Sequence, residues 1–362
     1  MITRREFAQR MAAGALGAGA MADSPLQRLL SSGQPAPPRL IFDAMAEVRT
    51  IYTMPLIEQI LAAGTNAITI TLTDPKPIGH ESFHLLLEDL AHYDRYFDDH
   101  PDHFIKARRV ADVQRARREK KLAIFYLIQN AAPIEDDLAR LTMLYNLGLR
   151  SVQLTYNVRN LVGDGCYERT DAGLSLFGLE LIDTMNATGM LVDLSHAGMK
   201  TMSEAIAASK KPVIISHTTC RALNPHRRNT TDENLRALAE KGGVAGMGQI
   251  RTFMTDKKRD NLSVYFDHID HAVKVAGVEH VAIGSDRDHR VIPDSEEEIA
   301  ILLKEEGAQF KPADWPLYLE KLNGPRRMEV VRDGLLERGY AEFDLDKILG
   351  GNLLRLYTES VG

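Results

Sequence analysis

Two histidines and one aspartate in this chain each follow directly after a short apolar run. His196 ends the segment DLSH, His217 ends the segment ISH, and Asp286 ends the segment GSD. Imidazole and carboxylate groups are the ligands that suit a borderline divalent ion such as zinc. One such histidine is usually a hydrogen-bonded structural residue. Two histidines and an aspartate at equivalent positions predict a metal site, provided that the fold brings the three runs together.

Eight short apolar runs are the elements that would position these residues. Each is rich in Val, Ile and Leu and shorter than an ordinary helix, as buried parallel strands are. The runs are 40–45, 67–72, 122–128, 151–156, 191–195, 212–216, 243–247 and 280–284. Most precede a segment with helical periodicity, such as 178–185, which closes near Gly189, and 232–239, which closes at Gly242.

Eight strand–helix units in one chain predict a (β/α)8 barrel of the TIM type, in which chemistry gathers at the carboxyl ends of the strands. The three candidate residues would then meet at one mouth. An open, doubly wound sheet is the alternative. No G-x-G-x-x-G or phosphate-loop motif supports that alternative.

Composition and charge narrow the function classes. The 362 residues are 44% hydrophobic and 26% charged, which is typical of a globular protein rather than a disordered one. A net charge of −6 argues against a nucleic-acid partner, and the absence of a long apolar run argues against a membrane span. Two cysteines, Cys166 and Cys220, are too few for a disulfide scaffold or a thiolate zinc site. They could pair in an oxidising compartment, but we expect free thiols.

The first residues resemble an export signal. Arg4 and Arg5 form a twin-arginine pair, an Ala- and Gly-rich run covers 11–21, and a small-x-small cleavage site precedes Asp23. These features predict a twin-arginine signal peptide over 1–22, a coil over 23–38 and a single barrel domain over 39–362. The expected location is the periplasm. The alternative is a frayed, basic N-terminus.

The longest connection between runs covers 74–121 and is dense in histidine. It contains five, which are His80, His84, His92, His100 and His103. Such an insert could bind metal. Because acids and aromatics surround these histidines, we expect instead a polar lid of helices in which they are solvated.

Further segments point to a known family. They are GLR at 148–150, LTYN at 154–157, GLSLFG at 173–178, RRN at 227–229 and GGNLLR at 350–355. Together with DLSH, ISH and GSD, in this order and spacing, they resemble the membrane (renal) dipeptidases over about residues 38–358. The resemblance implies an amidohydrolase-like barrel with a two-zinc centre that hydrolyses dipeptides and related small amides. It also implies that His196 and His217 hold the second zinc, that Asp286 is an acidic ligand of the first, and that Arg228 binds substrate.

Four positions depart from the family's pattern. The first strand of the family ends Asp-Gly-His-x-Asp, but here it ends DAMAE, so Met45 replaces a ligand histidine and Glu47 a ligand aspartate. Gln129 stands where a bridging glutamate is expected, and Tyr156 where a substrate-contacting histidine is expected. A thioether is a poor zinc ligand, and a neutral amide bridges two cations badly.

We therefore expect one tightly bound zinc ion rather than two. His196 and His217 would hold it, and Asp286, Glu47 or the oxygen of Gln129 would complete the coordination. Copper is a minor alternative, because methionine beside histidines suits copper better than zinc.

These groups predict hydrolysis by metal-activated water. Asp286 would accept a proton, Tyr156 would donate a hydrogen bond to the oxyanion, and Arg228 would bind a substrate carboxylate. Tyr156, Asn157 and Arg228 are thus the candidate substrate-binding residues. The expected function is an exported, dipeptidase-like hydrolase acting on a dipeptide or related small amide. The alternatives are a tailoring enzyme that acts on an exported metabolite and a binding protein or pseudoenzyme. Whether the chain forms a homodimer is left open.

Overall fold

The computed structural model describes residues 39–258, 261–306 and 310–362. The predicted signal peptide over 1–22 and the predicted coil over 23–38 lie outside the described residues. Among the helices that are described, none combines the length and the apolar character needed to cross a membrane.

The strands of the described residues form one parallel sheet. It runs in the order β1-β2-β4-β5-β6-β7-β8-β9, and β3 pairs with β4 beside this path. The strand bounds are β1 Ile41–Asp43, β2 Thr65–Thr71, β3 Phe104–Lys106, β4 Leu122–Ile128, β5 Leu149–Gln153, β6 Leu191–Asp193, β7 Ile214–Thr218, β8 Val244–Met247 and β9 Val281–Ile283.

The first and last strands meet, so the sheet is a nearly closed barrel. The Ala44 amide donates to the Ile283 carbonyl oxygen at 2.9 Å, and the Asp286 amide donates to the Met45 carbonyl oxygen at 2.9 Å. An open sheet would leave these two strands apart. The predicted (β/α)8 barrel is confirmed, and the doubly wound alternative is wrong.

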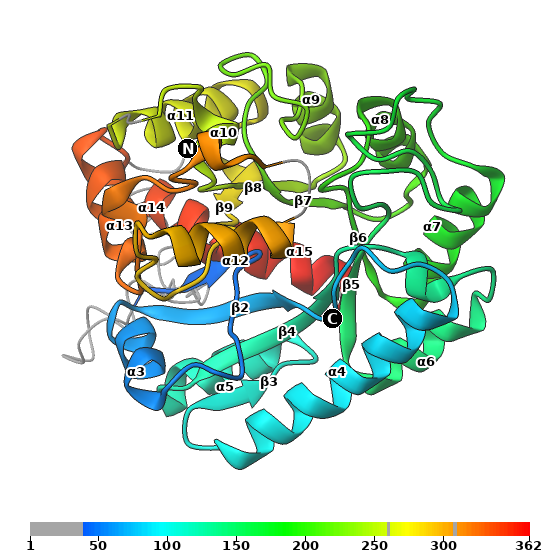
Figure 1. Cartoon of the computed structure of the whole chain (residues 1–362), viewed down its shortest axis with the longest axis horizontal. Coiled ribbons are helices and arrows are strands. Elements are labelled where there is room, and N and C mark those ends of the chain that lie inside the picture. Colours follow the sequence, from blue (N-terminus) through cyan, green and yellow to red (C-terminus); the bar gives the residue numbers. More distant parts are fainter. Residues whose placement is uncertain (1–38, 259–260, 307–309) are drawn as a thin grey trace, which may run out of the picture. The chain divides into compact units, whose positions relative to one another are not determined.

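Helices alternate with the strands and surround the barrel (Figure 1). The helix bounds are α3 Met54–Ala62, α4 His80–Asp99, α5 Val110–Glu119, α6 Ala139–Leu147, α7 Leu176–Thr188, α8 Met199–Ala208, α9 Asp232–Glu240, α10 Arg251–Met254, α11 Ser263–Ala276, α12 Glu296–Glu306, α13 Arg327–Glu337, α14 Glu342–Asp346 and α15 Asn352–Ser360. Two of them show the predicted signals plainly. The Ser175 hydroxyl caps α7, which ends at left-handed Gly189, and the Thr231 hydroxyl caps α9.

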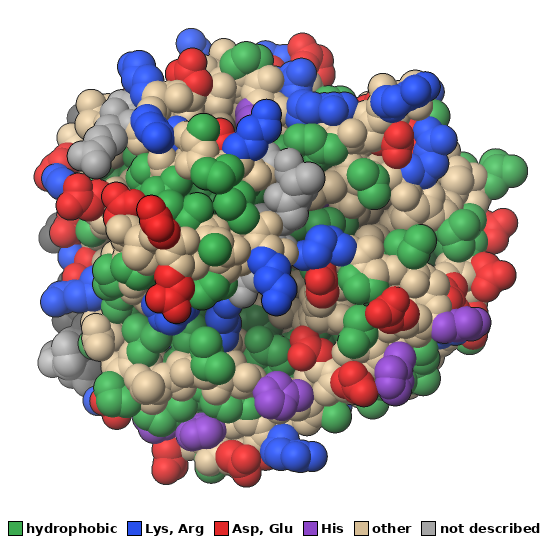
Figure 2. All heavy atoms as spheres, viewed as in Figure 1, with side chains coloured by type: hydrophobic (Ala, Val, Ile, Leu, Met, Phe, Trp, Pro, Cys, Tyr) green, Lys and Arg blue, Asp and Glu red, His purple; other side chains and the backbone are tan. Residues whose placement is uncertain are grey.

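The connection over 74–121 is not a simple lid. It contains α4, the unpredicted strand β3 and α5, and β3 extends the sheet beside β4. Three residues are too short a run to stand out by periodicity, which is why this strand was missed. Histidine side chains gather along the exposed edge of α4 (Figure 2), and His80 and His84 are strongly exposed. His100 is partly buried instead, with its Nδ1 2.8 Å from the Tyr96 carbonyl oxygen.

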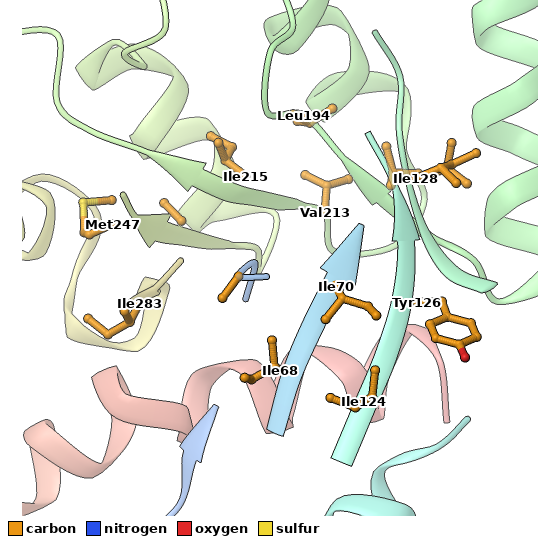
Figure 3. Packing of buried hydrophobic residues seen from close by; sticks show 14 of the residues in the cluster. Ile68, Ile70, Ile124, Tyr126, Ile128, Leu194, Val213, Ile215, Met247 and Ile283 are labelled. Atoms are coloured by element: carbon orange, nitrogen blue, oxygen red, sulfur yellow. The ribbon is translucent and has the colours of Figure 1, made fainter. Parts of the chain in front are cut away.

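Alternating residues of each strand pack on opposite faces. Ile68 and Ile70 of β2 lie beside Ile124 and Ile128 of β4 in the layer between strands and helices (Figure 3). The other face of β2 contains Ala67, Thr69 and Thr71 and is turned to the barrel axis, because Thr71 lines the cavity at the barrel mouth. At the opposite end, α15 closes the barrel. Its Tyr357 packs 4.7 Å from the Phe125 ring and hydrogen bonds to Thr69.

A candidate metal and substrate site

One cavity lies at the carboxyl ends of the barrel strands, and its volume is about 540 Å³. Seven of the eight predicted site residues line it, namely Glu47, Gln129, Tyr156, Asn157, His196, Arg228 and Asp286. The eighth, His217, is buried directly against His196. The barrel therefore brings together residues that are spread over some 240 positions of the sequence, as expected because the carboxyl ends of its parallel strands meet at one end.

The two histidines face each other through their Nε2 atoms, which are 3.0 Å apart. His196 follows β6 and His217 lies within β7, and these two strands are neighbours in the sheet. Burial, and next the positive charge of Arg228, lowers the pKa of each imidazole well below its ordinary value of 6.5. Both rings are therefore neutral at physiological pH, which is the form that binds a metal ion.

The hydrogen-bond partners determine where the imidazole protons lie. His196 Nδ1 is 2.8 Å from Asn157 Oδ1, an atom that can only accept, so His196 carries its proton on Nδ1 and a lone pair on Nε2. His217 Nδ1 is 2.9 Å from the Ser216 hydroxyl, which can donate or accept. If the hydroxyl donates to Nδ1, His217 carries its proton on Nε2 and donates it to His196 Nε2. If the hydroxyl accepts from Nδ1, the Nε2 atoms of both histidines have lone pairs that a metal ion could bind.

Beneath the histidines, Asp193 joins the ends of β6 and β7. Its Oδ1 accepts hydrogen bonds from the Ser195 and Ser216 amides, both at 3.0 Å. The Ser195 hydroxyl in turn accepts from the His217 amide at 3.0 Å. Interactions that orient a ligand are as much a part of a metal site as the ligand itself. Asp193 is the first residue of the segment DLSH, but its type and position alone did not predict this orienting role.

Three strand-end residues have left-handed backbone conformations that non-glycine residues rarely adopt. They are Asn157 with φ 61°, His196 with φ 64° and Asp286 with φ 55°. Each such conformation costs about 1–3 kcal/mol and persists only where the surroundings enforce it. Asn, His and Asp tolerate it better than most residues. Local strain therefore marks two of the three predicted strand-end ligands, His196 and Asp286, and the predicted substrate-binding residue Asn157.

Tyr156 and Arg228 complete the half of the cavity next to the histidines. The Tyr156 ring stacks on His196 with centroids 4.4 Å apart. Arg228 is buried, donates from Nη2 to the His217 carbonyl oxygen at 3.3 Å, and lies over the Phe253 ring. Its buried Nε has no hydrogen-bond partner within the described part of the chain.

The other half of the cavity is arranged differently. Met45 is buried at the wall, and the carboxylate of Glu47 forms an ion pair with Arg49. Arg49 also lies 3.5 Å from the carboxylate of Asp288. Of the residues that could coordinate a first metal here, one is thus a thioether and one is neutralised by an arginine.

Asp288 and His289, which lie two and three residues after Asp286, belong to a buried structural network. Asp288 accepts from Tyr52 and Arg290, and His289 Nε2 lies 3.0 Å from Arg327 Nη2. Arg327 also approaches Asp43, whose pKa is raised to about 6 because its burial outweighs the nearby positive charge. These contacts join the segments that follow the two strands at which the barrel closes, and they engage both side chains, although Asp288 also lines the cavity.

The donor set fits one metal ion better than two. Two zinc ligands at 2.0–2.1 Å in tetrahedral geometry are about 3.3 Å apart, close to the separation of the two Nε2 atoms. Over the described ranges, however, no three His, Cys, Asp or Glu side chains are grouped closely enough to hold an ion. The histidine pair is therefore preformed, and its further ligands are not. Cys166 and Cys220 are both buried free thiols.

Comparison with known proteins adds independent information. The model of the family described as membrane dipeptidase, peptidase family M19, matches residues 48–298. An uncharacterized dipeptidase of Schizosaccharomyces pombe is 38% identical over 178 residues, which cover 48% of this chain and 43% of that protein. An uncharacterized protein encoded in the 5′ region of pqqA in Klebsiella pneumoniae is 31% identical over 256 residues, covering 68% of this chain and 85% of that one.

Solved structures agree with this result. The crystal structure of an amidohydrolase from Pseudomonas aeruginosa superimposes with a TM-score of 0.80 and 28% identity, covering 90% of this chain and 97% of that chain.

Proposed function

The chain belongs to the membrane dipeptidase family, a family of metallopeptidases, and from this premise we propose that it is an exported hydrolase that cleaves a dipeptide or related small amide with one bound zinc ion. The observation that carries the proposal is the neutral pair His196 and His217, with Nε2 atoms 3.0 Å apart at a cavity shared with Tyr156, Arg228 and Asp286. A divalent ion at such a pair supplies activated water and polarises the substrate carbonyl.

The chain's own residues would do the rest of the work. Arg228, which lines the cavity and whose buried Nε has no partner among the described residues, would bind the free carboxylate of the substrate. Tyr156 would donate a hydrogen bond to the oxygen that becomes negative as water adds to the carbonyl carbon. Asp286 would accept the proton of that water and return it to the leaving nitrogen as the C–N bond breaks. Asn157 acts through His196, because its side-chain oxygen orients the ring.

The test of this function is a panel of L,L and L,D dipeptides, with zinc, manganese and copper supplied in turn. We expect slow but measurable hydrolysis of at least one member. The rate should depend on added metal and be lost on chelation.

One observation favours a second candidate, a binding protein without turnover on the same barrel. The pairing of Glu47 with Arg49 and the presence of Met45 remove ligands that a two-metal centre would use. A single activated water suffices for hydrolysis, so we prefer the enzyme. If no dipeptide in the panel is cleaved under any metal but dipeptides still bind, the second candidate takes its place.

Metal analysis should find about one tightly held ion per chain, because only the histidine half of the site retains good zinc ligands. The double variant Met45→His, Gln129→Glu should hold more, since it restores an imidazole and a bridging carboxylate. The measurement is elemental analysis of protein purified after native export. Two fully occupied ions in the unaltered protein would contradict the single-ion proposal.

Export by the twin-arginine route is also part of the proposal, and it rests on the residues of the segment 1–22. Fusing residues 1–30 to a folded reporter should carry the reporter to the periplasm. Substituting lysine for both Arg4 and Arg5 should retain the reporter in the cytoplasm. A reporter that stays in the cytoplasm with both arginines intact would show that the segment is not a signal.

A further inference from the structure

The cavity contains a second buried guanidinium, that of Arg287. This residue follows β9 and lines the cavity, and only 6% of its surface is exposed. Its Nε and Nη2 have no hydrogen-bond partner among the described residues. Its Nη1 makes one long contact, 3.5 Å from the Leu317 carbonyl oxygen, and its guanidinium lies over the Tyr318 ring.

Such an arrangement is costly for a purely structural arginine. Burying a charged group costs free energy, and a buried N–H without a hydrogen-bond partner adds to that cost, which the ring contact and the nearby carboxylates offset only in part. Arg327 shows how this chain treats a structural arginine. Its Nη1 donates to the Asp288 and Gly324 carbonyl oxygens, its Nη2 contacts Ser285, Arg287 and His289, and its Nε alone lacks a partner among the described residues.

The carboxylates near Arg287 are engaged elsewhere. Glu47 pairs with Arg49, and Asp288 accepts from Arg290 and Tyr52. Together with Asp286 they favour the charge on Arg287, yet none of them accepts from its Nε or Nη2. Nε and Nη2 are therefore buried donors without a partner among the described residues, on a side chain that lines the cavity.

Arg228 has a similarly buried guanidinium at another part of the cavity wall. It follows β7 and Arg287 follows β9, with β8 between the two strands. Both side chains are more than nine-tenths buried, and both have a buried N–H without a partner in the described structure. A volume of about 540 Å³ is in the range of small-molecule sites, so one ligand of dipeptide size can reach both walls.

We propose that Arg287 binds a second carboxylate of the substrate, so that the preferred substrate is a small amide with two carboxylates, such as a dipeptide with an Asp or Glu side chain. The planar guanidinium suits this role, because it presents parallel N–H groups to a carboxylate. This inference rests on the proposed hydrolase function and on Arg228 binding the first carboxylate.

The test uses dipeptides of equal shape that differ in one charge. Gly-Glu is compared with Gly-Gln, and Glu-Gly with Gln-Gly, as a ratio of kcat/KM values. In at least one pair the acidic member should be preferred by about tenfold or more, the effect expected of a charge-assisted hydrogen bond. In Arg287→Met the ratio should fall close to one. The control Arg332→Met, which removes an exposed arginine paired with Asp333, should keep it.

If Arg287→Met does not fold, Arg287→Lys is measured instead, because lysine keeps the positive charge but lacks the parallel N–H groups of the guanidinium. It should lower the ratio by a smaller factor. Equal rates within both pairs in the native protein, or an unchanged ratio in both Arg287 variants, would overturn the assignment of Arg287.

Binding separates this inference from the proposed function. If no dipeptide is cleaved, the hydrolase proposal fails, and Arg287 is then tested by calorimetric titration with succinate, glutarate and adipate against butyrate. At least one dicarboxylate should bind about tenfold more tightly than butyrate in native protein and lose that advantage in Arg287→Met. Equal affinities for dicarboxylates and butyrate would contradict the second carboxylate site.

Discussion

Replacing His196 with alanine should lower kcat/KM for every dipeptide that the native protein cleaves by at least about a thousandfold. One of two preformed metal ligands is lost, and the charge that activates water, worth several kcal/mol of barrier, goes with it. His217→Ala should have the same effect, because the two Nε2 atoms face one point. The measurement is steady-state kinetics on the dipeptide panel, with metal content determined on the same samples.

A matched control is His84→Ala, which removes an exposed histidine of α4 that pairs with Glu88. Its rate and metal content should equal those of the native protein. If His196→Ala cleaves any dipeptide as fast as the native protein does, the histidine pair is not the catalytic centre.

Replacing Arg327 with methionine should reduce the free energy of unfolding by about 3–5 kcal/mol, the usual cost of removing one partner of a buried charge network. Arg327 is 1% exposed, and it contacts three carbonyl oxygens, Ser285 and His289 where the barrel closes. The measurement is urea unfolding. Arg326→Met, at a neighbouring exposed arginine paired with Glu329, should change stability by less than about 0.5 kcal/mol.

The same variant should have a pH-dependent effect through Asp43. Burial raises the pKa of Asp43 from 3.8 to about 6, so the folded state binds this proton more tightly than the unfolded state does. The stability from that proton is complete below the unfolded pKa and is lost as the pH rises through the folded value. Without Arg327, ionised Asp43 loses its nearest positive charge, so Arg327→Met should cost more at about pH 8 than at about pH 5. An equal cost at both pH values would show that Arg327 does not act on Asp43.

Most of the barrel could be predicted because its strands have strong local signals. The runs at 67–72, 122–128 and 243–247 coincide with β2, β4 and β8 to within about two residues. The exception, β3, spans three residues and is held by its pairing with β4. Pairing between residues apart in sequence leaves no periodic trace, so it could be found only in the folded chain.

The sequence predicted which residues form the candidate site better than it predicted what those residues contact. Strand-end positions located His196, His217 and Asp286, because a parallel barrel sends the carboxyl ends of all its strands to one face, and the family resemblance located Arg228. Asn157 was expected to contact substrate, and the structure shows in addition that it orients His196. Arg287 escaped notice although it follows Asp286 directly, since an arginine in a sequence is exposed far more often than it is buried.

The sequence by itself determined which functional groups this protein has and which end of the barrel presents them, because both follow from residue type and from the local alternation of strand and helix. Only the tertiary structure decided which of these groups are partnered. The carboxylate of Glu47 forms an ion pair with Arg49, while Nε and Nη2 of Arg287 have no partner in the described structure. Asp43 bonds to Ser285 across 242 positions of the chain, and such distances in space have no counterpart in sequence spacing. Hydrogen bonds and desolvation act over a few ångströms in space, and for that reason the state of each group was set by folding.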